Sequence, residues 1–163
     1  MCVILSNTVL FAVAASISLF CAIGPSQAGC EGLVSDYLIE DGSRIDDPLC
    51  GLTGDALRGR DVFSGREGNC LACHRAPIPE QGFHGTVGPP LFDTGQHFSA
   101  AELRLRLVDS TRVNPETIMP PFHRIDGLRG VRSDRAGQPI LSAQQVEDVI
   151  AFLLTLKQEP PDE

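Results

Sequence analysis

A five-residue segment, Cys70-Leu71-Ala72-Cys73-His74, constrains this chain more than any other part of its sequence. The spacing C-x-x-C-H is typical of covalent haem attachment, because two thiols add to the vinyl groups of the porphyrin while the adjoining imidazole reaches the iron. A redox disulfide would instead favour a βαβ pattern, and a zinc site would need a second pair of ligands. The sequence suggests neither context. We therefore predict one haem c, attached through Cys70 and Cys73, with His74 as an axial ligand of its iron.

The N-terminal region predicts export to the periplasm. Residues 9–23 form a predominantly apolar run, and Ser26 and Ala28 supply small residues at the positions expected before a cleavage site. The apolar stretch is short for a membrane-spanning helix, which needs about 20 residues, so no stable membrane anchor is expected. We predict a cleaved signal peptide over residues 1–28. Lipidation of Cys30 is a weaker alternative.

Two further cysteines, Cys30 and Cys50, remain after the signal peptide and the haem motif are accounted for. In an oxidising compartment the simplest arrangement is a disulfide between them. It would close a loop of about 20 residues and stabilise the fold by roughly 3 kcal/mol. Two free thiols, or an intermolecular bond through Cys30, are the alternatives.

The charge of the chain limits the kinds of partner it can bind. A formal net charge of −8 argues against a nucleic-acid partner. Lys157 is the only lysine in the sequence, so the chain has no ring of lysines of the kind that some haem carriers use to dock acidic partners. The chain must therefore dock its protein partners through something other than a patch of lysines.

Capping signals and hydrophobic periodicity predict an all-α chain with long loops rich in proline and glycine. Thr53 is expected to cap the first helix. Ser99-Ala100-Ala101-Glu102 and Ser142-Ala143-Gln144-Gln145 are capping boxes that open the second and third helices. The three helices are expected over about residues 54–64, 100–109 and 143–157.

The second axial ligand of the iron is expected downstream of the haem motif. Met119 is the only methionine after the predicted signal peptide, and the two prolines that follow it favour a stiff, extended loop. Ligation by methionine and histidine is a standard haem arrangement, and it leaves the iron without an open position. Three other histidines lie in polar or proline-rich loops, where we expect exposed side chains: His84, His97 and His123.

Two further features resemble class I cytochromes c. Gly59 and Phe63 before the haem motif, with Val149 and Phe152 near the C-terminus, resemble the crossing terminal helices of that class. A glycine lets two helix backbones approach closely, and an aromatic ring from each helix seals the contact. Pro89 resembles the proline whose carbonyl accepts the Nδ1–H of the axial histidine. The resemblance implies an all-α class I cytochrome c domain.

More specific segments resemble the SoxX family of sulfur-oxidation cytochromes, over about residues 50–157. The loop around Met119 is the most specific of them, and residues 29–49 match only weakly. In chain order the segments are Gly51-Leu52-Thr53-Gly54-Asp55, Gly68-Asn69-Cys70-Leu71-Ala72-Cys73-His74, Ala76-Pro77-Ile78-Pro79-Glu80, Gly85-Thr86-Val87-Gly88-Pro89, Glu102-Leu103-Arg104-Leu105-Arg106, Asn114-Pro115-Glu116-Thr117-Ile118-Met119-Pro120-Pro121 and Pro139-Ile140-Leu141-Ser142-Ala143-Gln144.

This resemblance implies an electron-transfer subunit with no catalytic residue of its own. Members of the family pair with SoxA, a cytochrome with one or two haems, and together they couple thiosulfate oxidatively to a cysteine of the carrier SoxYZ. Such a complex is an L-cysteine S-thiosulfotransferase. This chain would accept the released electrons and relay them to a small cytochrome c or another acceptor. A freely diffusing periplasmic shuttle with one haem is the main alternative; a haem-based sensor is disfavoured by a sixth ligand on a rigid loop.

The predicted organisation has four parts. A signal peptide is followed by an N-terminal extension that carries Cys30 and Cys50, then by the cytochrome c domain and a short C-terminal tail. In order, they span residues 1–28, 29–50, 51–158 and 159–163.

Overall fold

The computed structural model describes residues 37–158, so the predicted signal peptide, Cys30 and the C-terminal tail lie outside the described residues. The described part contains four α-helices and four short 3-10 turns, and none of its residues forms a strand. The all-α prediction is therefore confirmed. The α-helices are α1 (Ala56–Ser64), α2 (Thr94–His97), α3 (Ala100–Asp109) and α4 (Ala143–Leu153), and the 3-10 turns are η1 (Leu49–Gly51), η2 (Cys70–Ala72), η3 (Ser110–Arg112) and η4 (Ser133–Arg135).

The capping boxes begin the second and third predicted helices as expected. In α3 the Ser99 hydroxyl accepts the Glu102 N–H while the Glu102 carboxylate accepts the Ser99 N–H, and Ser142 and Gln145 make the same reciprocal pair in α4. Each box satisfies two backbone donors that a helix start would otherwise leave unpaired.

The prediction that Thr53 caps the first helix is wrong. Asp55 is the cap of α1, because its carboxylate accepts the N–H of Arg58 at 2.9 Å. The Thr53 carbonyl instead accepts a hydrogen bond from the side chain of Gln144 in α4. Helix α1 therefore begins two residues later than the sequence predicted.

The last helix ends earlier than predicted, at Leu153 rather than near Lys157. The backbone beyond it turns away to bond with the region of α2. The N–H of Gly95 donates to the carbonyl of Leu156 at 2.8 Å, and the N–H of Gln158 donates to that of Phe92 at 3.0 Å. Leu156 lies beyond the end of the helix but is still buried, so the apolar pattern correctly marked it as a core position.

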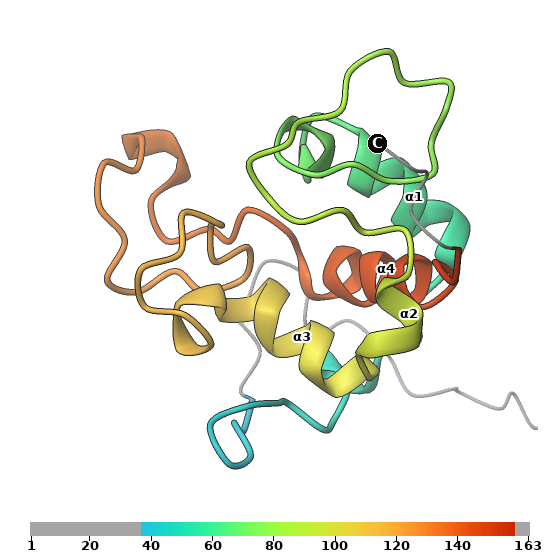
Figure 1. Ribbon diagram of the computed structural model, residues 1–163. Helices are drawn as coiled ribbons and strands as arrows, with labels where there is room; N and C mark the ends of the chain where they lie inside the picture. The colour runs from blue at the N-terminus through green and yellow to red at the C-terminus, as the bar shows by residue number, and fades with distance from the viewer. Residues whose placement is uncertain (1–36, 159–163) are drawn as a thin grey trace, which may run out of the picture.

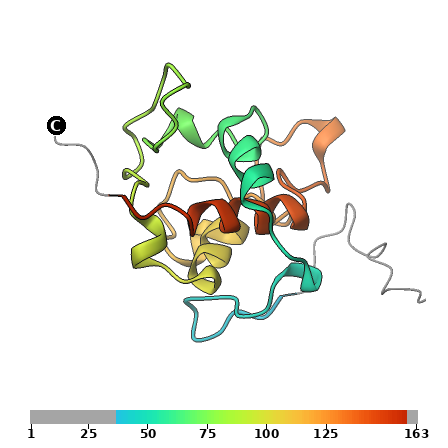
Figure 2. The same cartoon turned by 90° about the vertical axis from the view of Figure 1, so that its right-hand side faces the viewer.

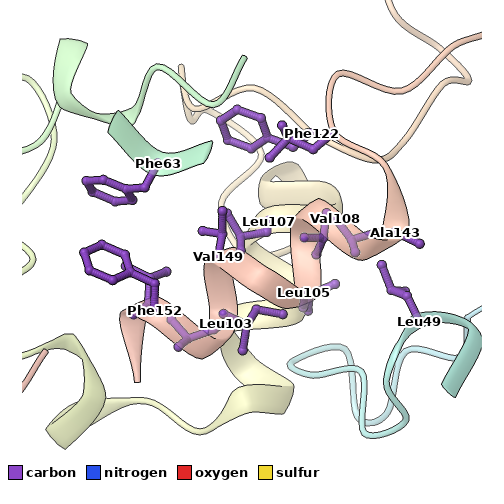
Figure 3. Close-up of a cluster of buried hydrophobic side chains, with 14 of the residues drawn as sticks. Leu49, Phe63, Leu103, Leu105, Leu107, Val108, Phe122, Ala143, Val149 and Phe152 are labelled. Carbon is purple, nitrogen blue, oxygen red and sulfur yellow. The ribbon is translucent and has the colours of Figure 1, made fainter. Parts of the chain in front are cut away.

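The crossing of α1 and α4 is the most extensive contact between helices in residues 37–158 (Figure 1). At Gly59 an added Cβ would lie 1.9 Å from the backbone oxygen of Asp148, a distance that no side chain can occupy. The rings of Phe63 and Phe152 meet edge to face with their centroids 5.3 Å apart, and Figure 3 shows them facing each other. The predicted crossing of the terminal helices is thus present, sealed by an aromatic pair.

Helix α3 packs against α4 on the side away from α1, so α4 lies between the other two (Figures 1 and 2). Leu103, Leu105, Leu107 and Val108 of α3 are buried against it (Figure 3). A fully buried ion pair joins the same two helices, with Arg104 Nε 2.7 Å from Glu147 Oε1. The apolar stripe and the paired charges together hold α3 in place.

The last part of the N-terminal extension belongs to the same core. Ile45 and Leu49 are buried, the carbonyl of Ile45 accepts a hydrogen bond from Arg104 at 2.7 Å, and the N–H of Leu49 donates to Glu147 at 2.9 Å. Cys50 is disulfide-bonded. The partner that the sequence predicts, Cys30, is among the residues that are not described.

Two long loops connect the helices, one over residues 73–93 and the other over residues 113–142 (Figure 1). The first begins within the haem motif, at Cys73, and the second carries Met119. In residues 37–158 no helix has the length and apolar character needed to cross a membrane.

Candidate haem site

A cavity of about 660 Å³ opens between α1, the haem motif, the two long loops, α3 and α4. Its walls are mainly apolar and include Phe63, Leu107, Phe122 and Val149. All the predicted site residues line it: Cys70, Cys73, His74, Pro89 and Met119. Residues that are far apart in the sequence are therefore brought to one space whose size is ordinary for a cofactor pocket.

The local backbone of the motif explains how both cysteines reach this cavity. Cys70 begins the turn η2, and its carbonyl accepts the N–H groups of Cys73 at 3.1 Å and of His74 at 2.9 Å. One helical turn therefore presents both thiols and the imidazole together. Burial raises the pKa of the Cys70 thiol to about 12, so this side chain is a neutral part of an apolar wall.

The loop after the motif lies directly against it. The N–H groups of Gly85, Gly88 and Leu91 donate to the carbonyls of Leu71, Cys73 and Arg75, each at 2.8 Å. At Gly88 an added Cβ would lie 2.3 Å from His74 Cε1, so only glycine fits beside the imidazole. These contacts hold the 85–91 segment against the histidine ring.

The His74 ring has a defined hydrogen-bond partner. Its Nδ1 lies 2.7 Å from the carbonyl oxygen of Pro89, the residue that the sequence singled out. With the Nδ1–H donating to that carbonyl, Nε2 carries the free lone pair that a metal requires. The ring is thus oriented as an axial ligand needs to be.

Met119 reaches the cavity from the second long loop and is partly buried against the core. Its N–H donates to Thr117 Oγ1 at 3.2 Å, and its carbonyl accepts a hydrogen bond from Ser110 Oγ at 2.6 Å. The sequence singled out Met119 but not these two hydroxyls, since a serine and a threonine in a loop carry no distinctive pattern.

The three competing histidines do not line the cavity. His97 is exposed, as predicted, and pairs with Asp93 at 3.0 Å. His84 is half-buried, with one ring nitrogen 3.3 Å from the N–H of Ala76 and the other 3.2 Å from the carbonyl of Ile78. Their hydrogen bonds account for both residues without any role at an iron.

The prediction that His123 is exposed is wrong. Its side chain is fully buried, and its Nδ1 lies 2.9 Å from the carbonyl oxygen of Leu141. The surrounding sequence is polar and suggested a surface loop. In the fold, however, the segment that leads into α4 covers this part of the loop. The N–H of Leu141 in that segment also donates to the carbonyl of Phe122 at 2.8 Å.

The cavity walls also include two cations that the sequence did not single out, Arg66 and Arg106. The guanidinium of Arg106 lies 4.3 Å from the centre of the Phe98 ring. Arg104, two residues earlier in the same helix, is instead buried with Glu147. The Leu-Arg-Leu-Arg-Leu alternation does not reveal this difference, because it depends on which face of α3 meets α4.

The residues around the cavity fit a haem c. Two thiols stand one helical turn apart, an imidazole and a thioether are both present, and the walls are apolar with cationic groups available for propionates. Imidazole and thioether are a usual axial pair for haem iron, and an apolar pocket suits the macrocycle. The donor set and its surroundings are thus consistent with the group that the motif predicts.

Comparison with solved structures supports an assignment to a family. The fold is similar to a chain in the crystal structure of SoxXA from P. pantotrophus, with a TM-score of 0.67 and 33% sequence identity. The similarity covers 76% of this chain and 95% of that chain. No protein-family model and no curated protein sequence matches. At this identity and coverage the similarity extends beyond the fold alone, and the chain belongs to the SoxX family of cytochromes, with the all-α class I cytochrome c fold.

Proposed function

We propose that this chain is the haem c electron-transfer subunit of a SoxAX-type L-cysteine S-thiosulfotransferase. The observation that carries the proposal is the convergence of Cys70, Cys73, His74 and Met119 on one apolar cavity in a SoxX-family fold. When bound, the haem supplies a one-electron iron couple. The protein's own side chains must attach the haem, ligate its iron and orient those ligands.

Each of these side chains has a separate task. Cys70 and Cys73 would hold the haem through thioether bonds, and His74 and Met119 would ligate its iron from the motif and from the second long loop. The Pro89 carbonyl accepts the Nδ1–H of His74 at 2.7 Å, which orients the ring and raises its basicity as a ligand. With His74 and Met119 both bound, the iron would offer no position to a substrate. The chain therefore relays electrons and contributes no catalytic residue.

The partner of this chain, in the proposal, is a SoxA-like cytochrome with one or two haems. The solved relative is described as SoxXA, which supports such a pairing. Val87 and Ile118 both line the cavity, yet they are 67% and 78% exposed. Exposed apolar side chains at the edge of a redox site are typical of a surface that another protein covers.

The wider reaction follows from that pairing. The complex couples thiosulfate to a cysteine of a SoxYZ-like carrier, with catalysis in the partner. This chain accepts the electrons released and passes them to a small cytochrome c or another acceptor. We place the complex in the periplasm, after removal of residues 1–28, with residues 51–158 as the cytochrome c domain.

Replacement of the proposed sixth ligand tests the site. In Met119→Ala the iron should lose its sulfur ligand and bind cyanide or carbon monoxide, which the intact protein should resist. Ultraviolet–visible spectra with and without each ligand, together with the reduction potential, are the measurements. An unchanged spectrum, ligand affinity and potential would show that Met119 is not axial.

Purification under native conditions tests the partnership. When the chain is expressed with haem maturation and its neighbouring genes, it should copurify with a SoxA-like cytochrome in equal amounts. Thiosulfate-dependent reduction of its haem should require that partner. A monomer that carries electrons without any stable partner would support the diffusing shuttle instead.

A further inference from the structure

We propose that Ser110 is a positioning residue that holds Met119 at the iron by closing the ligand loop onto the end of α3. The inference rests on the proposed haem function, in which Met119 is the sixth ligand. It assigns a role to a residue that the motif does not include.

Ser110 bonds to both ends of a short segment, residues 110–119, which includes the start of the second long loop and is the ligand loop of this proposal. Its backbone carbonyl accepts the N–H of Val113 at 3.1 Å and that of Asn114 at 3.0 Å, which fixes the start of the loop. Its side-chain hydroxyl donates to the carbonyl of Met119 at 2.6 Å, which fixes the end. One residue therefore bonds to both ends of the loop from residue 110 to residue 119.

The position of Ser110 is itself well determined. It follows directly after α3, whose residues are packed against α4, and its own side chain is only 5% exposed. A hydroxyl in this environment has little access to water as an alternative partner, so the bond to Met119 is retained. Because the end of α3 is held by this packing, the hydrogen bond from Ser110 also restrains the backbone of the ligand loop at Met119.

Thr117 holds the same residue from the other side. Its Oγ1 accepts the N–H of Met119 at 3.2 Å, and the next residue, Pro120, restricts the backbone that follows. Both peptide groups of Met119 are thus bonded to hydroxyls, and Ser110 and Thr117 both line the cavity. With both peptide groups held, the Met119 sulfur could leave the iron only by rotation of its own side chain, because wider movement of the loop would break these bonds.

The expected consequence is a change in the rate at which external ligands bind the iron. An external ligand can bind the iron only after the sulfur has left, so the rate of ligand entry reports how firmly the loop is held. Loss of one buried hydrogen bond of ordinary strength changes such an opening equilibrium about tenfold. We therefore expect Ser110→Ala to bind external ligands about ten times faster than the unaltered protein.

The experiment compares haem-loaded variants by stopped-flow mixing with cyanide for the ferric form and carbon monoxide for the ferrous form. Ser64→Ala is the matched control, because the Ser64 hydroxyl also donates to a backbone carbonyl, that of Arg60 at 2.8 Å, but on α1. Ser110→Ala should accelerate binding of both ligands and weaken the absorption band of the ferric iron–sulfur bond. Ser64→Ala should leave both unchanged.

The thermal unfolding of the same variants separates a positioning role from a merely structural one. If Ser110→Ala and Ser64→Ala lower the unfolding temperature alike but bind ligands at the rate of the unaltered protein, the proposal for Ser110 is overturned. If Met119→Ala opens the iron while Ser110→Ala does not, only this inference fails. If Met119→Ala also leaves ligand binding unchanged, the proposed axial ligation fails with it.

Discussion

His123 is a fully buried imidazole within the segment that follows the ligand loop. Burial lowers its pKa below the ordinary value for histidine, and the Leu141 carbonyl and the charge of Glu147 oppose this only in part. Because the pKa is lower in the folded protein than in the unfolded chain, the unfolded chain takes up a proton first as the pH falls. This contribution to stability is complete above the unfolded pKa and is lost as the pH falls toward the folded value.

We predict that the free energy of unfolding of the haem-loaded protein falls between about pH 7.5 and pH 5.5, which spans the ordinary histidine pKa of about 6.5. A single group cannot contribute more than about 1.4 kcal/mol for each pH unit. Urea titrations at both pH values measure it. In His123→Gln, which keeps a side-chain N–H near the Leu141 carbonyl, the pH dependence should flatten. Equal slopes in the two proteins would contradict the assignment, since every other histidine is common to both.

Between elements, the contact of α1 with α4 combines a close backbone approach with a buried carboxylate. Asp148 of α4 accepts hydrogen bonds from the Asp55 N–H at 2.7 Å, from Arg58 Nε at 2.9 Å and from Gln144 Nε2 at 2.9 Å. Burial by itself would raise the pKa of Asp148, but these hydrogen bonds and the charge of Arg58 together lower it below its ordinary value. The start of α1 is thus anchored on α4 by an ionised side chain.

Gly59→Ala tests how closely the two helices must approach. The added methyl would meet the Asp148 backbone, and the helices would have to separate. Although alanine favours the helix by about 1 kcal/mol, we expect a net loss of about 2 kcal/mol or more in the free energy of unfolding. Chemical denaturation measures this loss.

Gly82→Ala is the control for that substitution, because an added Cβ at Gly82 meets nothing within 4 Å. Its stability should stay close to that of the unaltered protein. A stability of Gly59→Ala as high as that of the control would mean that α1 and α4 need no such close contact.

For the molecule as a whole, the haem cavity is a large part of the interior. It lies among α1, α3 and α4, and its walls include Phe63, Leu103 and Val149, all of them core residues. With no tryptophan and one tyrosine in the sequence, the protein has few large side chains with which to fill such a space. Bound haem would supply the apolar contacts that these walls otherwise lack.

We therefore predict that Cys70→Ala combined with Cys73→Ala, which removes both attachment points, abolishes stable folding. Circular dichroism during heating should show no cooperative transition in the haem-free double variant. Met119→Ala keeps the covalent attachment and should still melt cooperatively. A cooperative melt of the haem-free chain would refute the prediction.

Several features of this protein depend only on neighbouring residues and could be predicted from the sequence. The haem motif places two thiols and an imidazole on one turn, and the capping boxes at Ser99 and Ser142 bond residues three positions apart. The ligand role of Met119 was predicted from its loop and from its being the only methionine after the predicted signal peptide, and it stays a prediction. Chemistry of this kind is local, so a short segment is sufficient to specify it.

Features that depend on distant partners could be recognised only in the folded chain. Asp55 rather than Thr53 caps α1 in a structure where Thr53 bonds to α4, and His123 is buried because the chain near Leu141 covers it. Arg104 is internal because Glu147, 43 positions later, meets it. Burial and long-range pairing arise when separate segments pack together, and no local pattern records which segments those will be.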